Sequence, residues 1–338
     1  MALPHRVLSL SALIVPIFCA LACVAQAAAP IKLPLPWTRG AQVAYRSEAV
    51  SEKTRAGTHQ SLRTTETLRI EVTEVDPDRI VLLWHNDAPV VEGSGDAPNL
   101  TRELAIAQAL SRSVGAIAYQ VELNAKGEFL GLRNWEALAA AMRGVLLPAL
   151  VAQARERPEL ATLDEAALRA RIDPVLVRNS GRNATNASLG REAAIFNYFT
   201  GAGMTPGETR EYDDNVASPW SGDLIPTHGS FEMTAVDEKA GTVSIRWKQD
   251  MDPEKAREVV IRNVETATGK PIPPEARDRL PAGVKLSDRA LVVLDRASGL
   301  PLSLEHVREV EFGGGSSRNQ WTLERLPDPP VAAAAATP

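Results

Sequence analysis

Serine and histidine side chains are the residues of this chain that could support nucleophilic hydrolysis. The segments His228-Gly229-Ser230 and 93–95 (Gly-Ser-Gly) come nearest to such a site. Neither is the Gly-x-Ser-x-Gly elbow in which hydrolases present a nucleophilic serine. A serine beside a histidine in sequence is not a catalytic triad, because triad partners meet in space. We therefore interpret both segments as loop tips and keep an unrecognised hydrolase as an alternative function.

Histidines and carboxylates could also bind a metal or transfer protons. Outside the first 27 residues the histidines are His59, His85, His228 and His306. No two of them lie three to five residues apart, so no helix or hairpin presents a ready pair of ligands, although His85 could approach His228 if two hairpins pack. The acids of 211–214 could act as an acid–base pair if burial separated their pKa values, but a charged strand edge is the simpler interpretation. We expect no metal and no cofactor.

Large aromatic side chains are sparse and fall on predicted strands and on one predicted helix. Core packing is their usual role, because aromatic rings bury much apolar surface. The functional alternative is a pocket that binds an acyl chain or another apolar ligand. It would be lined by Trp84, Trp247, Phe196, Tyr198 and Phe199. The two interpretations differ in whether Trp84, Trp247 and Phe196 line a void or pack against one another.

Alternating apolar and polar residues predict the strands that carry these tryptophans. Residues 67–75 alternate with period two, a turn follows at 76–78, and 80–84 return to Trp84. Residues 230–236, a turn at 237–241 and 242–247 repeat this pattern and end at Trp247. Further strands are expected at 45–50, 60–75 and 319–326.

The order of elements around these hairpins also repeats. Helical stretches follow at 100–111 and 253–266, and each leads to another hairpin, at 117–132 and 289–310. Both later hairpins place glycine at the end of the turn, where a positive φ costs little. Order and turn chemistry together favour an internal duplication.

A region rich in Ala, Leu, Glu and Arg separates the two halves. It predicts helices at 135–142, 146–155, 163–179 and 189–199, with a loop at 183–188. We therefore predict an α+β fold: a large curved antiparallel sheet built from two similar halves, with a helical insert packed on it. The expected parts are a signal peptide (1–27), the first sheet half (38–133), the insert (134–203), the second sheet half (204–326) and a disordered tail (327–338).

Several turn and strand residues resemble a known group of proteins. Tyr119-x-Val121-x-Leu123 with Gly127 and Phe129 precedes a helix opened by Asn134, and Met204-x-Pro206-Gly207-Glu208 follows the helices. This arrangement resembles a broad group of uncharacterised exported bacterial proteins. Their outline is similar to the half-barrel of periplasmic lipoprotein carriers and their outer-membrane receptor relatives. The resemblance implies a fold and binding of something apolar, and it brings no catalytic residue.

The N-terminus indicates export. A nearly continuous apolar run from Val7 to Val24 is followed by Ala25-Gln26-Ala27, a small-x-small pattern that suits signal peptidase. Cleavage there would remove Cys19 and Cys23, so that the mature chain would have no thiol. In the alternative reading, 20–23 form a lipobox and Cys23 carries a lipid anchor in the envelope. We expect a periplasmic protein in either case.

The charge and composition of the chain limit the classes of partner that it is expected to bind. The net charge is −5, and there is no block of Lys and Arg, so nucleic acid is not an expected partner. No segment after the signal is expected to span a membrane. The residues favour a non-enzymatic envelope protein that binds an apolar ligand, such as a lipid or acyl chain, or an envelope partner. The alternatives are a partner-docking module with a filled core and the hydrolase.

Overall fold

The computed structural model describes residues 29–327, except 161, 219–220 and 280–284. The predicted signal peptide with Cys19 and Cys23, and all of the predicted tail beyond Pro327, lie outside the described residues. Cleavage, lipidation and export therefore stay predictions.

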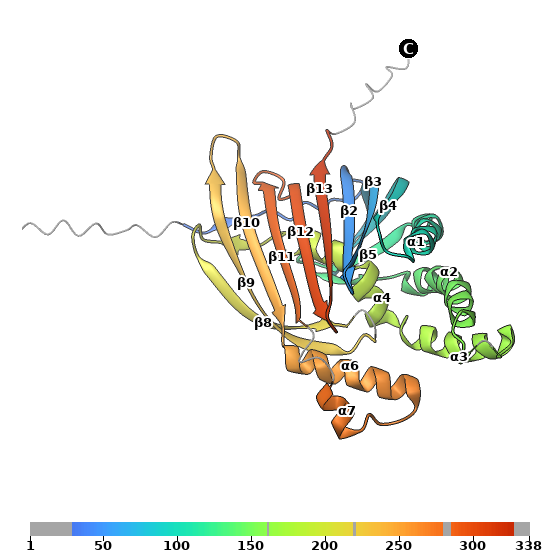
Figure 1. Ribbon diagram of the computed structural model, residues 1–338. Helices are drawn as coiled ribbons and strands as arrows, with labels where there is room; N and C mark the ends of the chain where they lie inside the picture. The colour runs from blue at the N-terminus through green and yellow to red at the C-terminus, as the bar shows by residue number, and fades with distance from the viewer. Residues whose placement is uncertain (1–28, 161, 219–220, 280–284, 328–338) are drawn as a thin grey trace, which may run out of the picture.

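Eleven of the described strands form one antiparallel sheet in the order β6-β5-β4-β3-β2-β13-β12-β11-β10-β9-β8 (Figure 1). They are β2 (Gln42–Arg55), β3 (Thr58–Val75), β4 (Arg79–Gly95), β5 (Tyr119–Asn124), β6 (Phe129–Leu132), β8 (Thr209–Ala217), β9 (Leu224–Asp237), β10 (Thr242–Met251), β11 (Lys285–Asp295), β12 (Pro301–Phe312) and β13 (Gly315–Arg325). Two short strands, β1 (Ile31–Lys32) and β7 (Gly203–Met204), pair separately.

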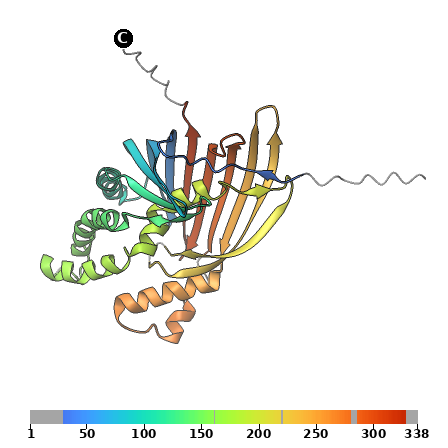
Figure 2. The same cartoon turned by 180° about the vertical axis from the view of Figure 1, so that it is seen from behind.

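The path of the chain divides this sheet into two halves. Strands β2 to β6 meander outward to one edge, and β8 to β13 begin at the opposite edge and meander back. The halves meet where β2 pairs with β13, so that the beginning and the end of the folded chain lie side by side. The predicted α+β fold with a curved antiparallel sheet in two halves is confirmed (Figures 1 and 2).

Alternation of burial explains why these segments are strands. In β11 every second residue from Leu286 to Leu294 is buried, and the residues between them face outward. The turns behave as predicted, since Gly127 and Gly299 have φ values of 87° and 74°. Both halves contain a hairpin, a helix and a second hairpin in that order. A common origin of the halves stays a prediction.

The helices are α1 (Leu100–Val114), α2 (Trp135–Arg155), α3 (Glu165–Arg178), α4 (Arg182–Leu189), α5 (Arg191–Asn197), α6 (Pro253–Thr268) and α7 (Pro274–Arg279). Asp252 caps α6, because its carboxylate accepts hydrogen bonds from the amides of Glu254 and Lys255. Helices α1 to α3 gather beside the first sheet half, and α6 and α7 lie at one end of the second half (Figure 1).

Two predictions within the insert are wrong. Residues 183–188 were expected to form a loop, but they belong to α4, where Asn186 accepts a hydrogen bond from the amide of Leu132. Asn and Ser lower helix propensity, and contacts with β6 outweigh that preference here. The helices expected at 135–142 and 146–155 are one continuous helix, α2, with Pro148 inside it.

The length of α2 bears on the prediction that no segment after the signal spans a membrane. Among the described residues α2 is long and apolar enough to span a bilayer by length and composition, with a mean hydropathy of 1.6 over its best window. Only 22% of that window is buried in the fold. This helix of 21 residues replaces the two shorter helices that were expected, and the absence of a membrane span after the signal stays a prediction.

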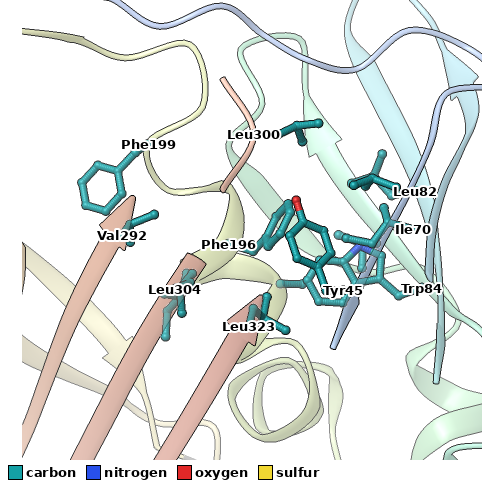
Figure 3. Close-up of a cluster of buried hydrophobic side chains, with 14 of the residues drawn as sticks. Tyr45, Ile70, Leu82, Trp84, Phe196, Phe199, Val292, Leu300, Leu304 and Leu323 are labelled. Atoms are coloured by element: carbon teal, nitrogen blue, oxygen red, sulfur yellow. The ribbon is translucent and has the colours of Figure 1, made fainter. Parts of the chain in front are cut away.

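Aromatic residues from the insert join the two halves of the sheet. Phe196 on α5 contacts Tyr45 and Trp84 of the first half, with ring centroids 5.3 and 5.4 Å apart (Figure 3). Phe199, three residues later, contacts Phe231 of the second half at 6.0 Å. One turn of chain thus packs against both halves, and this cluster forms the centre of the main core.

Candidate functional site

The five residues of the predicted pocket lie at different places. Phe196, Phe199 and Trp247 are buried in the core, with 2%, 3% and 6% of their surface exposed. Tyr198 is 41% exposed and lines a surface depression beside 32–35. Trp84 alone lines the cavity described next. Trp84 and Phe196 touch each other, whereas the ring nearest to Trp247 in the insert is Tyr198, at 5.8 Å. Ligand binding by this set as a whole stays a prediction.

A cavity of about 400 Å³ lies between the first sheet half and the helices, and we call it the α1 cavity. Its lining residues come from α1, α2, the end of α4 and the start of α5 on one side, and from β2, β3, β4, β5 and β13 on the other. Its apolar lining comprises Ala49, Leu68, Trp84, Ala107, Leu110, Val114, Met142, Leu189 and Trp321; the remaining lining residues are Ser47, Thr64, Glu66, Asn86, Ser111, Gly115, Tyr119, Ser188 and Glu192. Pockets for small molecules are of this size and combine an apolar wall with a few polar groups.

Glu66 is the unusual member of this lining. It faces the same side of β3 as the buried Leu68 and Ile70, opposite Ser47 of β2. No described residue forms a hydrogen bond or ion pair with its carboxylate. Burial, reinforced by the charge of Glu192, raises the pKa of Glu66 from 4.5 to about 7.

The second carboxylate of the cavity has a partner. Glu192 on α5 forms an ion pair with the neighbouring Arg191, with 3.0 Å between Oε1 and Nη2. Tyr119 on β5 lines the cavity together with Glu66 and Glu192. Burial, Glu192 and Glu66 all raise the pKa of the Tyr119 hydroxyl. The electrostatic potential in the cavity is therefore negative. Arg191 offsets the charge of Glu192, and no described residue offsets that of Glu66.

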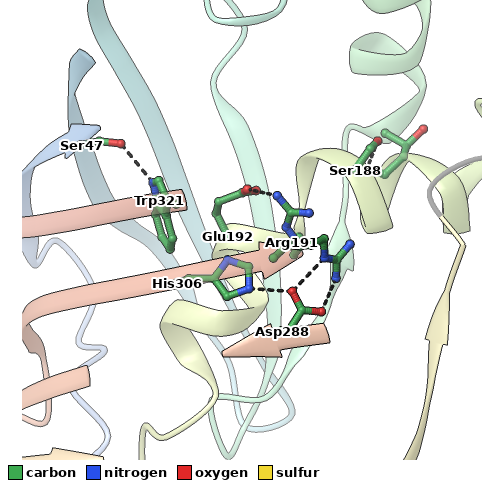
Figure 4. Close-up of polar contacts among 9 residues, drawn as sticks. Ser47, Ser188, Arg191, Glu192, Asp288, His306 and Trp321 are labelled. Carbon is green, nitrogen blue, oxygen red and sulfur yellow. Dashed lines mark hydrogen bonds and ion pairs between the residues drawn. The ribbon is translucent and has the colours of Figure 1, made fainter. Parts of the chain in front are cut away.

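A fully paired polar cluster lies on the same face of the sheet in the second half (Figure 4). Asp288 on β11 accepts two hydrogen bonds from Arg308, at 2.8 and 2.6 Å, and contacts Nε2 of His306 at 2.8 Å. Burial opposes ionisation, but Arg308 and His306 outweigh it and hold the pKa of Asp288 well below its usual range. His306 and Arg191 line a second cavity of about 220 Å³, which adjoins the first and shares Ala49, Thr64, Ala107, Glu192 and Trp321 with it.

The residues considered for hydrolysis form an incomplete arrangement. His228 and Ser230 are not at a loop tip, because both lie within β9. Nδ1 of His228 contacts Asp213 at 2.9 Å, and both side chains are largely exposed, at 61% and 89%. No hydrogen bond between Ser230 and His228 is formed. His85 lies on β4, and six strands separate β4 from β9, the strand of His228, so these two histidines are not neighbours.

The acidic run of 211–214 lies on β8, an edge strand of the sheet, as expected. Asp213 contacts His228 across to β9, and Tyr212 accepts a hydrogen bond from the indole of Trp247. In the described part of the chain, no group of three His, Cys, Asp or Glu side chains is placed to hold a metal ion.

Glu66 of the α1 cavity and Asp288 of the paired cluster were not among the predicted site residues, although the sequence carries a signal for both. Glu66 has the same parity along β3 as Leu68, and Asp288 has the same parity along β11 as Ala290. An ionisable residue at an inward-facing position of a strand is unusual, because burying a charge is costly unless it is paired.

Comparisons with known proteins leave the family open. No protein family and no curated protein matches the chain. A structure described as showing lipid–protein interactions in lipovitellin aligns with 86% of this chain at 8% identity and a TM-score of 0.41. A β-barrel-like protein of a domain of unknown function from Brucella abortus aligns with 86% at 10% identity and a TM-score of 0.18. The chain spans a quarter of the lipovitellin chain and all of the second one. Likenesses this low carry no argument about function.

Proposed function

We propose that this chain is a non-enzymatic protein of the cell envelope that binds an apolar ligand, of the size of an acyl chain, in the α1 cavity. The observation that carries the proposal is the cavity itself. About 400 Å³ remains unfilled between the helices and the sheet, beside a core in which Trp84 and Phe196 pack closely.

The test is to fill the cavity and measure binding of a neutral apolar probe. Ala107 on α1 lines the cavity, and Ala105, two residues earlier, is exposed on the outer side of the same helix. We expect Ala107→Phe to reduce binding of the neutral fluorescent probe N-phenyl-1-naphthylamine at least tenfold, and Ala105→Phe to leave it unchanged. Equal binding by both variants, or no binding by the unmodified protein, would contradict the proposal.

A further inference from the structure

The α1 cavity has an imbalance of charge that its apolar character does not explain. Of its eighteen described lining residues, two are glutamates and none is Lys, Arg or His. Arg191 neutralises Glu192 from outside the lining. Glu66 has no such partner, and one uncompensated carboxylate therefore faces the cavity.

An unpaired acid in an apolar wall is costly, and the fold contains the means to avoid it. Asp288, on the same face of the sheet, receives Arg308 and His306 from the neighbouring strand. Glu66 lies opposite Ser47 on one neighbouring strand, β2. On the other, β4, a bulge lies opposite Glu66 and contributes no Lys, Arg or His. A positively charged ligand could therefore serve as the partner that Glu66 lacks.

Aromatic rings surround the same space. Trp84, Tyr119 and Trp321 all line the cavity, and they come from three different strands. The faces of aromatic rings attract cations, and sites that bind quaternary ammonium groups combine such rings. Carboxylate and aromatic rings together favour an ammonium head group over an anionic one.

We propose that the α1 cavity selects an amphiphile with an ammonium head group, whose charge lies beside Glu66 and whose alkyl chain lies against Leu110, Val114 and Met142. This inference rests on the proposed function and adds the class of ligand to it. It also makes a fatty acid the poorer ligand, since its carboxylate would face Glu66 and Glu192.

The experiment compares three amphiphiles of equal chain length by isothermal titration calorimetry, at concentrations at which each is dissolved as monomers. These are dodecyltrimethylammonium, dodecanoate and neutral dodecanol. At pH 8, where Glu66 is mostly ionised, we expect the ammonium compound to bind at least tenfold more tightly than dodecanoate. In Glu66→Gln we expect that preference to fall at least tenfold while dodecanol binding is retained.

The matched control is Glu71→Gln. Glu71 lies on β3 as Glu66 does, but at a position of opposite parity, on the other face of the sheet. It should keep the full preference for the ammonium compound. If dodecanol and dodecanoate bind and the ammonium compound has no advantage, or if Glu66→Gln keeps the advantage, the head-group inference is overturned and the proposed function survives. If none of the three binds, both are overturned.

Discussion

Asp288 and Glu66 are acidic side chains on the same face of one sheet, and their surroundings differ. Asp288 in the second half has Arg308 and His306 within hydrogen-bond distance, and the pKa of its carboxyl is lowered. Glu66 in the first half has no partner among the described residues, and its pKa is raised to about 7. The buried acid of the second half is therefore paired within the protein, whereas the one in the first half lies unpaired beside a cavity.

The helices account for this difference between the halves. In the second half, α6 lies at one end of the sheet and covers a small separate core with Ile225 and Met251. In the first half, α1 lies along β4 and contacts α2, so that helices arch over the sheet and leave a space between them. The same order of elements thus places a helix over a cavity in the first half and at one end of the sheet in the second.

The largest effect is expected at Asp288. Replacing it by Asn leaves the guanidinium of Arg308 buried without its counter-charge, and removing one partner of a buried pair costs about 3–5 kcal/mol. Asp288→Asn should lose that much free energy of unfolding in urea at pH 7. Because the pKa of Asp288 is lowered in the folded state, this advantage of the unmodified protein should disappear as the pH falls through the acid range.

Asp250→Asn is the control, since Asp250 is exposed on the adjacent strand β10. Its effect should stay within about 0.5 kcal/mol. An equal loss of unfolding free energy in Asp288→Asn and Asp250→Asn would mean that the buried cluster does not stabilise the fold. The contrast between Asp288 and Glu66 would then be lost.

A smaller effect of opposite sign is expected at Glu66. Its pKa is higher in the folded state than the ordinary 4.5, so the folded protein holds the extra proton between about pH 4.5 and 7. Raising the pH through this window removes that proton and lowers stability. Glu66→Gln should abolish this decline and be about 1–2 kcal/mol more stable than the unmodified protein at pH 8, after allowance for partial exposure.

Urea unfolding at pH 5, 6, 7 and 8 measures this effect, with Glu71→Gln as the control that keeps the decline. Identical pH profiles for Glu66→Gln and the unmodified protein would show that Glu66 carries no penalty. The contrast with Asp288 would then be lost.

The smallest effect is expected at the exposed pair of Asp213 and His228. Exposed ion pairs contribute about 0–1 kcal/mol. His228→Ala should change the free energy of unfolding by less than about 0.5 kcal/mol. Neither His228→Ala nor Ser230→Ala should alter hydrolysis of p-nitrophenyl acetate; loss of a measurable rate in both variants would favour the hydrolase alternative.

Much of the fold follows from local patterns in the sequence. Alternation around Ile70 and Ile245 predicts the hairpins, and Asp252-Pro253 predicts the start of α6. The site depends on where α1 rests on the sheet, which no local pattern specifies. The parity of Glu66 along β3 marks it as inward-facing, but only the position of α1 shows that a cavity lies beside it.

The aromatic residues show the same limit. Trp84 and Trp247 occupy matching places in their hairpins, as predicted, yet Trp84 lines a cavity while Trp247 donates a hydrogen bond to Tyr212 in a packed region. Their surroundings come from α1 in one half and from Tyr198 in the other. Side-chain type and position along a strand therefore do not distinguish core from pocket.

The central claim is that Glu66 is left unpaired for a cationic ligand, and the titration of its carboxyl tests this most directly. We would follow the side-chain carbon signal of ¹³C-labelled glutamate, assigned with Glu66→Gln, as the pH changes. We expect a pKa of about 7 for Glu66 in the free protein and a fall of this pKa toward the ordinary value of Glu when dodecyltrimethylammonium is bound. An ordinary pKa in the free protein, or one that does not fall when the compound binds, would contradict it.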